Sequence, residues 1–218
     1  MADRVWPQPI FQMAIFARKS TRFAGITHSV HSPGIMMLAG LILVASASHA
    51  NPQFDQSEYQ LEAQFLVNFT KFVNWPDKSF AEPESHFMVC IVGHDPFGNA
   101  LDSNLLRQTI ENRTVEIVRY PTAASLPPNR SCQIAFISAS EKQHFQEIID
   151  IFEGHSTLLV ADVDGFLELG GTVELLPKDS HIRFAVNPES ADRADLKVSS
   201  KLLALAEIVH DDSRKGRN

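Results

Sequence analysis

Two periods of apolar residues alternate along residues 51–218, and their order predicts a mixed α/β fold. The first period is helical and covers residues 57–75, where one face collects Leu61, Phe65, Phe69, Phe72 and Val73. Ser57 and Gln60 form a capping box that predicts the start of this helix, and Pro76 predicts its end. We interpret the segment as an amphipathic helix packed against the core.

Short apolar segments follow and predict strands. Four of them are candidates for strands, at 86–92, 114–120, 132–137 and 157–161. The first has the apolar pattern of a buried strand, and the second alternates between apolar and polar residues. Two more, at 172–176 and 181–186, flank a Pro-Lys-Asp-Ser turn and predict a β-hairpin. Between the fourth strand and the hairpin, residues 162–171 are expected to form a glycine-bearing connection.

Three further helices are predicted among these strands. The first carries Leu101, Leu105 and Leu106, and the second is capped by Ser138 or Ser140 and carries Phe145, Ile148, Ile149 and Phe152. The last is capped by Ser199 or Ser200 and is expected to run to Val209. Strands that alternate with helices imply a mostly parallel sheet with helices on both faces, here with an antiparallel hairpin near its C-terminal end.

The first fifty residues have the pattern of a signal peptide. Residues 34–45 form a twelve-residue run without a charge, preceded by the basic residues Arg18, Lys19 and Arg22. Small residues at Ser48 and Ala50 predict cleavage before Asn51. The apolar run is shorter than the roughly 20 residues of a membrane-spanning helix, although an uncleaved anchor is the alternative.

We therefore expect residues 1–50 to be a long signal peptide and residues 51–218 to be one exported α/β domain with a frayed tail from about residue 211. The length of the leader also allows translation to begin at Met13. Export predicts a periplasmic location, where ATP is absent.

Composition and charge narrow the function. The 218 residues are 44% hydrophobic and include 15 Phe, which suffices for a core and argues against disorder. The net charge is −7 for the whole chain, and residues 51–218 hold 15 basic and 25 acidic residues. Such an acidic domain disfavours a nucleic-acid partner, because binding to phosphates needs a basic face.

Motifs for enzyme chemistry are weak. The turn Gly-His-Asp-Pro-Phe-Gly at 93–98 lacks the Lys and Ser/Thr of a phosphate loop, and Asp95 lacks the other residues of a phosphate-accepting receiver. Asp162 and Asp164 resemble the start of a calcium loop, but Val173 stands where the closing Glu is needed. His144 and Glu147 share a helix face without a second ligand cluster. We expect no catalytic residue, no metal and no cofactor.

The two cysteines give the strongest inference from the residues alone. Cys90 lies in the first predicted strand and Cys132 begins the third. Doubly wound sheets commonly place these strands side by side, within the ~5.5 Å between Cα atoms that a disulfide needs. An oxidising compartment favours the bond, with two buried thiols as the alternative.

Several stretches taken together resemble the YfiR-like family of exported bacterial proteins. They are FLVNFTKFVNWP (65–76), VCIVGHDPFG (89–98), CQIAFIS (132–138), LLVADVDGFLELGGTVELL (158–176) and HIRFAVNPESADRADLKVSSKLLALA (181–206). The resemblance covers nearly all of residues 51–218. Each motif is weak alone, but their order and spacing are specific.

The resemblance implies a function that composition cannot supply. It implies a non-enzymatic periplasmic repressor that binds the sensor domain of an inner-membrane diguanylate cyclase and keeps cyclic di-GMP low. It further implies a homodimer and sequestration by an OmpA-like outer-membrane lipoprotein. Cys90 and Cys132 match the family's recurring disulfide, whereas a second disulfide found in some members has no counterpart here, because the chain has only two Cys.

The same resemblance marks candidate residues for partner binding. Phe72, Trp75 and Pro76 match its first motif, and Gly93, Asp95, Pro96, Phe97 and Gly98 match its second. Trp75 is a candidate interface anchor, with capping of the core as the favoured alternative. Arg183 and Asn187, near the exit of the hairpin, are candidates for binding an acidic group.

Two functions from different classes follow. The first is a regulator that acts on a membrane-bound signalling enzyme by protein–protein contact. The second is a periplasmic sensor of a small ligand, coupled to a kinase or a transport system, which predicts a pocket that binds a metabolite without any partner protein.

Overall fold

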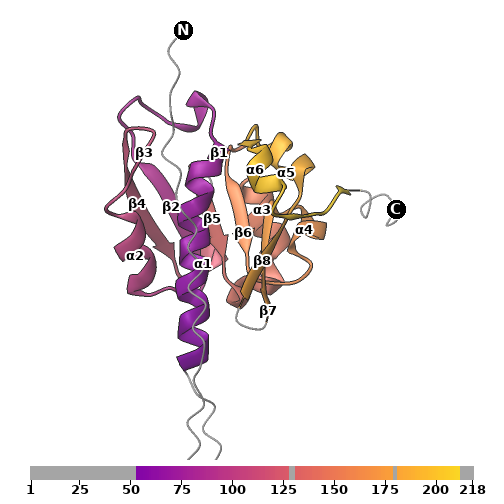
Figure 1. Cartoon of the computed structure of the whole chain (residues 1–218). Helices are drawn as coiled ribbons and strands as arrows, with labels where there is room; N and C mark the ends of the chain where they lie inside the picture. The colour runs from indigo at the N-terminus through magenta and orange to yellow at the C-terminus, as the bar shows by residue number, and fades with distance from the viewer. Residues whose placement is uncertain (1–52, 128–130, 179–180, 212–218) are drawn as a thin grey trace, which may run out of the picture. The chain divides into compact units, whose positions relative to one another are not determined.

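Helix α1 (Gln53–Phe72) runs along one face of an eight-stranded sheet in the computed structural model, which describes residues 53–127, 131–178 and 181–211 (Figure 1). The helix begins before the expected capping box at Ser57 and ends at Phe72, before Trp75. It ends there because the carbonyl of Phe72 accepts a hydrogen bond from the N–H of Ser199 at 2.8 Å. The next residues form the short strand β1 (Val73–Asn74), which pairs antiparallel with β9 (Lys197–Val198).

The main sheet is mostly parallel, as expected. Its strands lie in the order β10 (Glu207–Ile208), β8 (His181–Val186), β7 (Val173–Lys178), β6 (Leu158–Ala161), β5 (Ile134–Ile137), β2 (Phe87–Val92), β4 (Arg113–Tyr120) and β3 (Thr109–Ile110). Only the β7–β8 hairpin and the β3–β4 pair are antiparallel. The predicted hairpin and the predicted adjacency of the first and third main strands are confirmed.

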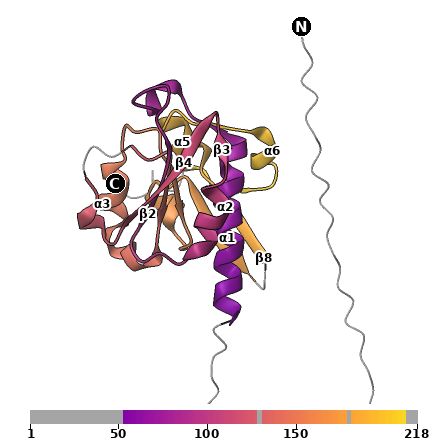
Figure 2. The same ribbon diagram turned by 90° about the vertical axis from the view of Figure 1, so that its left-hand side faces the viewer.

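Helices cover both faces of this sheet, and α1 and α3 lie on opposite sides of it (Figure 2). Successive residues of β2 point to opposite faces, so Phe87, Val89 and Ile91 join the core under α1 and α2 (Asn99–Leu105). Cys90 and Val92 join a second core under the 3₁₀ turn η3 (Ala139–His144), α3 (Phe145–Ile151) and α4 (Phe166–Leu169). This two-sided burial explains why the strand has an almost unbroken apolar sequence.

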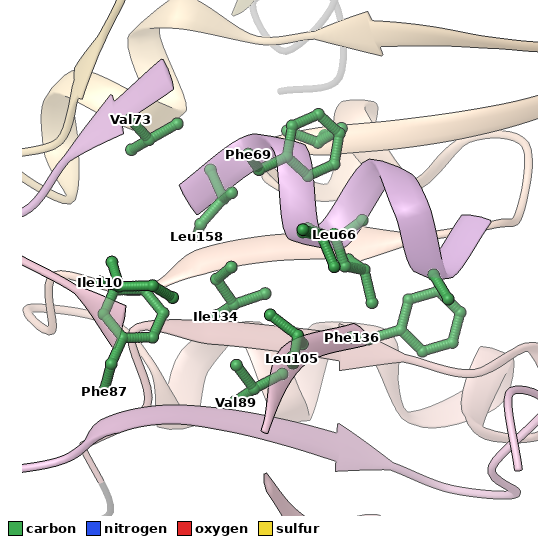
Figure 3. Close-up of a cluster of buried hydrophobic side chains, with 14 of the residues drawn as sticks. Leu66, Phe69, Val73, Phe87, Val89, Leu105, Ile110, Ile134, Phe136 and Leu158 are labelled. Carbon is green, nitrogen blue, oxygen red and sulfur yellow. The ribbon is translucent and has the colours of Figure 1, made fainter. Parts of the chain in front are cut away.

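The core between α1 and the sheet is the larger of the two. Leu66 and Phe69 of the helix meet Val89, Ile134 and Phe136 of the strands (Figure 3), and all five are 0% exposed. The helix also contacts the hairpin, where the rings of Phe69 and Phe184 lie 5.8 Å apart. Helix α1 therefore connects the centre of the sheet to the hairpin.

The structure corrects the prediction for the C-terminal segment. Helix α6 (Ser200–Leu203) is capped by Ser199, but it stops at Leu203 and does not run to Val209. Residues Glu207–Ile208 instead form β10, and the N–H of Val209 bonds the carbonyl of Val186 at 2.9 Å. The backbone is drawn into the sheet because β8 offers a free edge there, which no local pattern could indicate.

Two short helices were not predicted, one of them inside the expected connection 162–171. The segment 162–171 contains α4, enclosed by Gly165 and Gly170 with φ angles of +88° and +115°. Helix α5 (Pro188–Arg193) follows the hairpin and is capped by the side chain of Asn187. The 3₁₀ turns η1 (Asp77–Ser79) and η2 (Ala123–Ser125) complete the elements of the described residues.

The predicted signal peptide and the apolar run 34–45 lie outside the described residues, as do residues 212–218 of the expected tail. In the described ranges, no helix combines the length and apolar character needed to cross a membrane.

Candidate functional site

The family-motif turn at residues 93–98 lies at the carboxyl end of β2, between the two strands that neighbour β2. β2 pairs with β4 on one side and with β5 on the other. The chain passes to these neighbours over opposite faces of the sheet. Open α/β sheets commonly bind ligands in a crevice at such a switch point. Whether the turn can bind a ligand therefore depends on whether this crevice is already filled.

The protein's own side chains fill the crevice. The N–H of Gly93 donates to the carbonyl of Tyr120 at 2.8 Å, and the N–H of His94 donates to Oγ of Ser140 at 2.9 Å. A Cβ at Gly93 would lie 2.4 Å from Oγ of Ser140 and 2.8 Å from Cγ of Glu141. At Gly93 and His94, therefore, the turn offers neither a free backbone N–H nor space for a phosphate.

Asp95 is a structural partner of Arg119. One oxygen of its carboxylate accepts the N–H of Phe97 at 2.8 Å, and the other accepts Nε of Arg119 at 2.7 Å. The guanidinium of Arg119 also bonds the carboxylate of Asp102 on α2. Arg119 thus connects the turn, β4 and α2, and both oxygens of Asp95 are engaged.

Phe97 and Gly98 place α2. The ring of Phe97 is 5% exposed and packs edge-on against Phe136, with centroids 4.6 Å apart. Gly98 has a φ of +50° and directly precedes α2. Phe97 thus serves the core and Gly98 the start of a helix, and of the two only Gly98 is exposed.

Trp75 is an interior anchor. Its ring is 6% exposed and meets Phe87 edge-on at 4.9 Å. The indole N–H donates to the carbonyl of Gln133 at 2.8 Å. Phe72 is half-buried against the same core, and the carbonyl of Pro76 accepts the N–H of Ser79 at 2.9 Å. The favoured alternative for Trp75, capping of the core, agrees with these contacts.

The disulfide is present. Cys90 and Cys132 are bonded, their Cα atoms lie 5.9 Å apart, and both residues are almost fully buried. The bond joins the middle of β2 to the residue that leads into β5. It lies on the α3 side of the sheet, opposite α1.

Gln133 is a connecting residue that the sequence analysis missed. It is 1% exposed, and its side-chain oxygen accepts the N–H of Met88 at 2.7 Å. Its amide nitrogen donates to the carbonyl of Ser79, also at 2.7 Å. With the bond from Trp75, it joins η1, β2 and β5. A lone Gln between Cys132 and an apolar strand is the one sequence signal for such a role.

Arg183 and Asn187 both bind carboxylates, and these belong to the chain's own C-terminal segment. Nη2 of Arg183 lies 3.8 Å from Oε2 of Glu207, and both side chains are exposed. The side chain of Asn187 is buried and donates from Nδ2 to Asp211 at 2.8 Å. Asp211 also pairs with Arg193.

Two cavities lie away from the 93–98 turn. One, of about 530 Å³, is an open hollow lined by residues of α3, β6 and α5, with Phe152, Thr157 and Ser190 among them. The other, of about 380 Å³, lies beside η1 and includes Met88, Glu116 and Gln133 in its lining. Among the described residues, no cluster of three or more His, Cys, Asp or Glu side chains forms a candidate metal site.

A match to a family model identifies the chain. Residues 59–207 fit the model of the YfiR/HmsC-like family, which is more than half of the sequence. The protein belongs to the YfiR/HmsC-like family. This match spans all eight strands of the main sheet except the end of β10, so the family fold and the described domain coincide.

No functionally curated protein matches the sequence of this YfiR/HmsC-like protein. A solved structure described as a conserved domain protein from Vibrio cholerae O1 biovar eltor aligns with a TM-score of 0.46 and 8% identity. The alignment covers 69% of this chain and 59% of that one, so the match spans less than two thirds of the Vibrio protein.

Proposed function

We propose that this protein is an exported, non-enzymatic regulator that represses an inner-membrane diguanylate cyclase by binding its periplasmic sensor domain. The observation that carries the proposal is the family match over residues 59–207. The YfiR/HmsC-like family is one of regulators, and no catalytic family matches the chain.

The geometry at the family motifs supports contact with a protein over catalysis. The N–H groups of Gly93 and His94 and the carboxylate of Asp95 are bonded within the fold, to Tyr120, Ser140 and Arg119. A carboxylate paired in this way has little capacity left for acid–base chemistry on a substrate. Regulation by surface contact needs only a stable scaffold, which the two cores and the disulfide supply.

The predicted leader and the acidic surface support a periplasmic site of action. The signal-peptide pattern of residues 1–50 would deliver the domain to the compartment where the sensor domain lies, and where Cys90 and Cys132 oxidise. An OmpA-like outer-membrane lipoprotein would then release the cyclase by sequestering the regulator. The regulator itself would act as a homodimer.

A second candidate function is favoured by one specific observation. The cavity of about 530 Å³ between α3 and α5 has the size of a small-ligand site. A periplasmic sensor that binds a metabolite there would be stabilised by its ligand without any partner protein. A thermal-shift screen of the purified protein with small periplasmic metabolites tests this alternative.

The deciding experiment measures cellular cyclic di-GMP in a strain that lacks the gene. Complementation uses the full-length chain and, as the matched control, a version that lacks residues 2–50. We expect cyclic di-GMP to rise on deletion and to return to the parental level only with the full-length chain. An unchanged level on deletion under several growth conditions would count against the cyclase as target, and rescue by the truncated form would count against export.

A further inference from the structure

Strand β4 leaves one side of its backbone without a neighbouring strand. It pairs with β2 over six residues, from Val115 to Tyr120. On its other side β3 reaches only Arg113 and Thr114, because β3 is two residues long. Residues 115–119 of β4 therefore form an open edge of the main sheet, and Figure 2 views the molecule from the side of this edge.

The direction of the backbone groups identifies which of them are open. The carbonyl of Tyr120 points toward β2, because it accepts the N–H of Gly93. Backbone groups alternate in direction along a strand, so those of Glu116 and Val118 also point toward β2. Those of Val115, Ile117 and Arg119 point away from β2. Val115 is buried next to the last β3–β4 pair, Thr109 with Thr114, whereas Ile117 and Arg119 have no partner strand on that side in the described part of the chain. The N–H and C=O groups of Ile117 and Arg119 can therefore pair with a further strand.

Charged side chains flank this edge on both faces of the sheet. Glu116 is exposed and is the one acidic or basic side chain, His86 aside, in the lining of the 380 Å³ cavity. On the other face, Arg119 lies between Asp95 and Asp102, so the three side chains carry a net charge of −1. Charges on an edge discourage unspecific pairing, and here their balance is acidic.

We propose that residues 115–119 are a docking edge for an extended segment of a partner protein, which pairs with β4 and places a Lys or Arg side chain against Glu116. The cavity beside Glu116 receives the charged end of that side chain, with the apolar Met88, the residue paired with Glu116 on β2, next to it. That this partner is the regulated membrane protein rests on the proposed function. That β4 has a docking edge does not rest on it.

Charge favours a basic partner over a second copy of this chain. A second copy would bring the same acidic groups, Glu116, Asp95 and Asp102, to the same edge, and residues 51–218 are acidic as a whole. A basic strand would meet complementary charge on both faces.

A pair of substitutions at Ile117 isolates the backbone. Ile117→Pro removes an outward N–H and leaves the ladder to β2 intact, because edge strands tolerate Pro at such positions. Ile117→Thr removes the same half-buried apolar side chain and keeps the N–H, so it is the matched control. With equal melting temperatures for the two variants, we expect the Pro variant to bind the purified periplasmic domain of the cyclase at least ten-fold more weakly than the Thr variant. Equal affinities would overturn the docking edge.

A second pair tests the charge. Glu116→Lys should weaken binding ten-fold or more, whereas Glu147→Lys on the exposed face of α3 makes the same change in net charge and should leave the affinity within two-fold of the parent.

Amide exchange gives the location without any substitution. The N–H groups of Ile117 and Arg119 should exchange much faster than that of Val118 in the free protein and become protected in the complex. Equal protection in the free protein would show that the edge is already covered.

Failure of the proposed function is distinguishable from failure of the edge. If the cyclase domain does not bind the parent protein at all, a photo-crosslinking residue at position 117 of the full chain is used in cells, with position 147 as control. The edge would be retained if an adduct forms at 117 only and maps to a Lys- or Arg-bearing strand of another membrane protein. The adduct should also be lost with a Pro substitution at the neighbouring outward position, Val115→Pro. That membrane protein would then replace the cyclase as the proposed partner. No adduct, or an adduct only with a second copy of this chain, would overturn the docking edge.

Discussion

At the scale of single residues, the positions that match the family motifs work mainly inside the fold. Gly93 permits η3 to pack against the turn, Asp95 fixes Arg119, and Trp75 bonds the carbonyl of Gln133. Their identities are thus set by close approach and hydrogen bonding within the domain. Partner contacts have to be sought on other residues, such as the open edge of β4.

Replacement of Gly93 by Ala should be strongly destabilising. Its φ of +94° disfavours any side chain, and the new Cβ would lie 2.4 Å from Oγ of Ser140. Gly154→Ala is the matched control, because Gly154 has a φ of +78° but nothing within 4 Å of its Cβ position. By urea unfolding we expect a loss of about 3 kcal/mol at Gly93 and about 1 kcal/mol at Gly154. Equal losses would mean that η3 shifts away from the new side chain at little cost in free energy.

Trp75→Phe should lower stability and spare partner binding. The variant loses the hydrogen bond to the carbonyl of Gln133 and part of a buried ring, at a cost of about 1–2 kcal/mol in the free energy of unfolding. Urea unfolding measures the cost, and titration of the folded variant with the cyclase domain measures affinity. A ten-fold loss of affinity with unchanged stability would instead make Trp75 an interface anchor.

The role of a residue could be predicted from the sequence where that role depends on nearby residues or on which strands pair. The cysteines lie in strands that α/β sheets place together, so their bond was accessible to prediction. The role of Gln133 was not, because it depends on Ser79, Met88 and Trp75 arriving from separate segments. Long-range hydrogen bonds leave little trace in a local pattern.

At the scale of elements, the long apolar segments were predictable and the short ones were not. Strands β2 and β4 and helix α1 have strong periods, although α1 ends early where β9 captures the chain. Helix α4 has four residues, too few for a period, and depends on Glu174, whose carboxylate accepts the N–H of Phe166 at 2.9 Å. Strand β10 exists only because β8 is beside it.

Glu174 should give the protein a pH-dependent stability. Burial raises the pKa of this carboxyl above its ordinary value of 4.5, and the hydrogen bonds from the N–H groups of Leu167 and Phe166 offset burial only in part. A raised pKa in the folded state means that the folded state holds the proton more tightly than the unfolded state. The contribution to stability is therefore full below pH 4.5 and is lost as the pH rises through the raised pKa.

Glu174→Gln keeps an oxygen that accepts from α4 and removes this titration. Relative to the parent, the variant should gain stability as the pH rises from below 4.5 toward neutrality, as measured by thermal unfolding over that range. Glu147→Gln, which replaces an exposed carboxylate on α3, is the control and should follow the parent. A parallel pair of curves for the parent and Glu174→Gln would contradict the assignment.

At the scale of the whole molecule, the disulfide and the sheet order act together. The bond joins residues 42 positions apart and closes a loop that contains β4 and α2. The sequence predicted that β2 and β5 are neighbours, but the positions of β4, β3 and β10 toward the edges depend on the crossovers, which the pattern of apolar residues does not specify.

Removal of the disulfide should cost about 4 kcal/mol in the free energy of unfolding, because a loop of this length restricts the unfolded chain by that amount in the chain-entropy model. The double substitution of Cys90 and Cys132 by Ala is compared with the parent in urea, with and without reductant. Reductant should bring the parent close to the variant and leave the variant unchanged. An oxidised parent no more stable than the variant would contradict a stabilising role.

The central position of β2 has a consequence for the chain while it is being synthesised and exported. β2 is the first strand of the main sheet to be synthesised, yet its neighbours β4 and β5 end only at Tyr120 and Ile137. Until those residues leave the ribosome or the export channel, the sequence Phe-Met-Val-Cys-Ile-Val has no partner on either side, and it is uncharged and prone to β-aggregation. A nascent chain of this protein therefore needs a chaperone over that interval, and arrest of synthesis between β2 and β5 should yield its most aggregation-prone fragment.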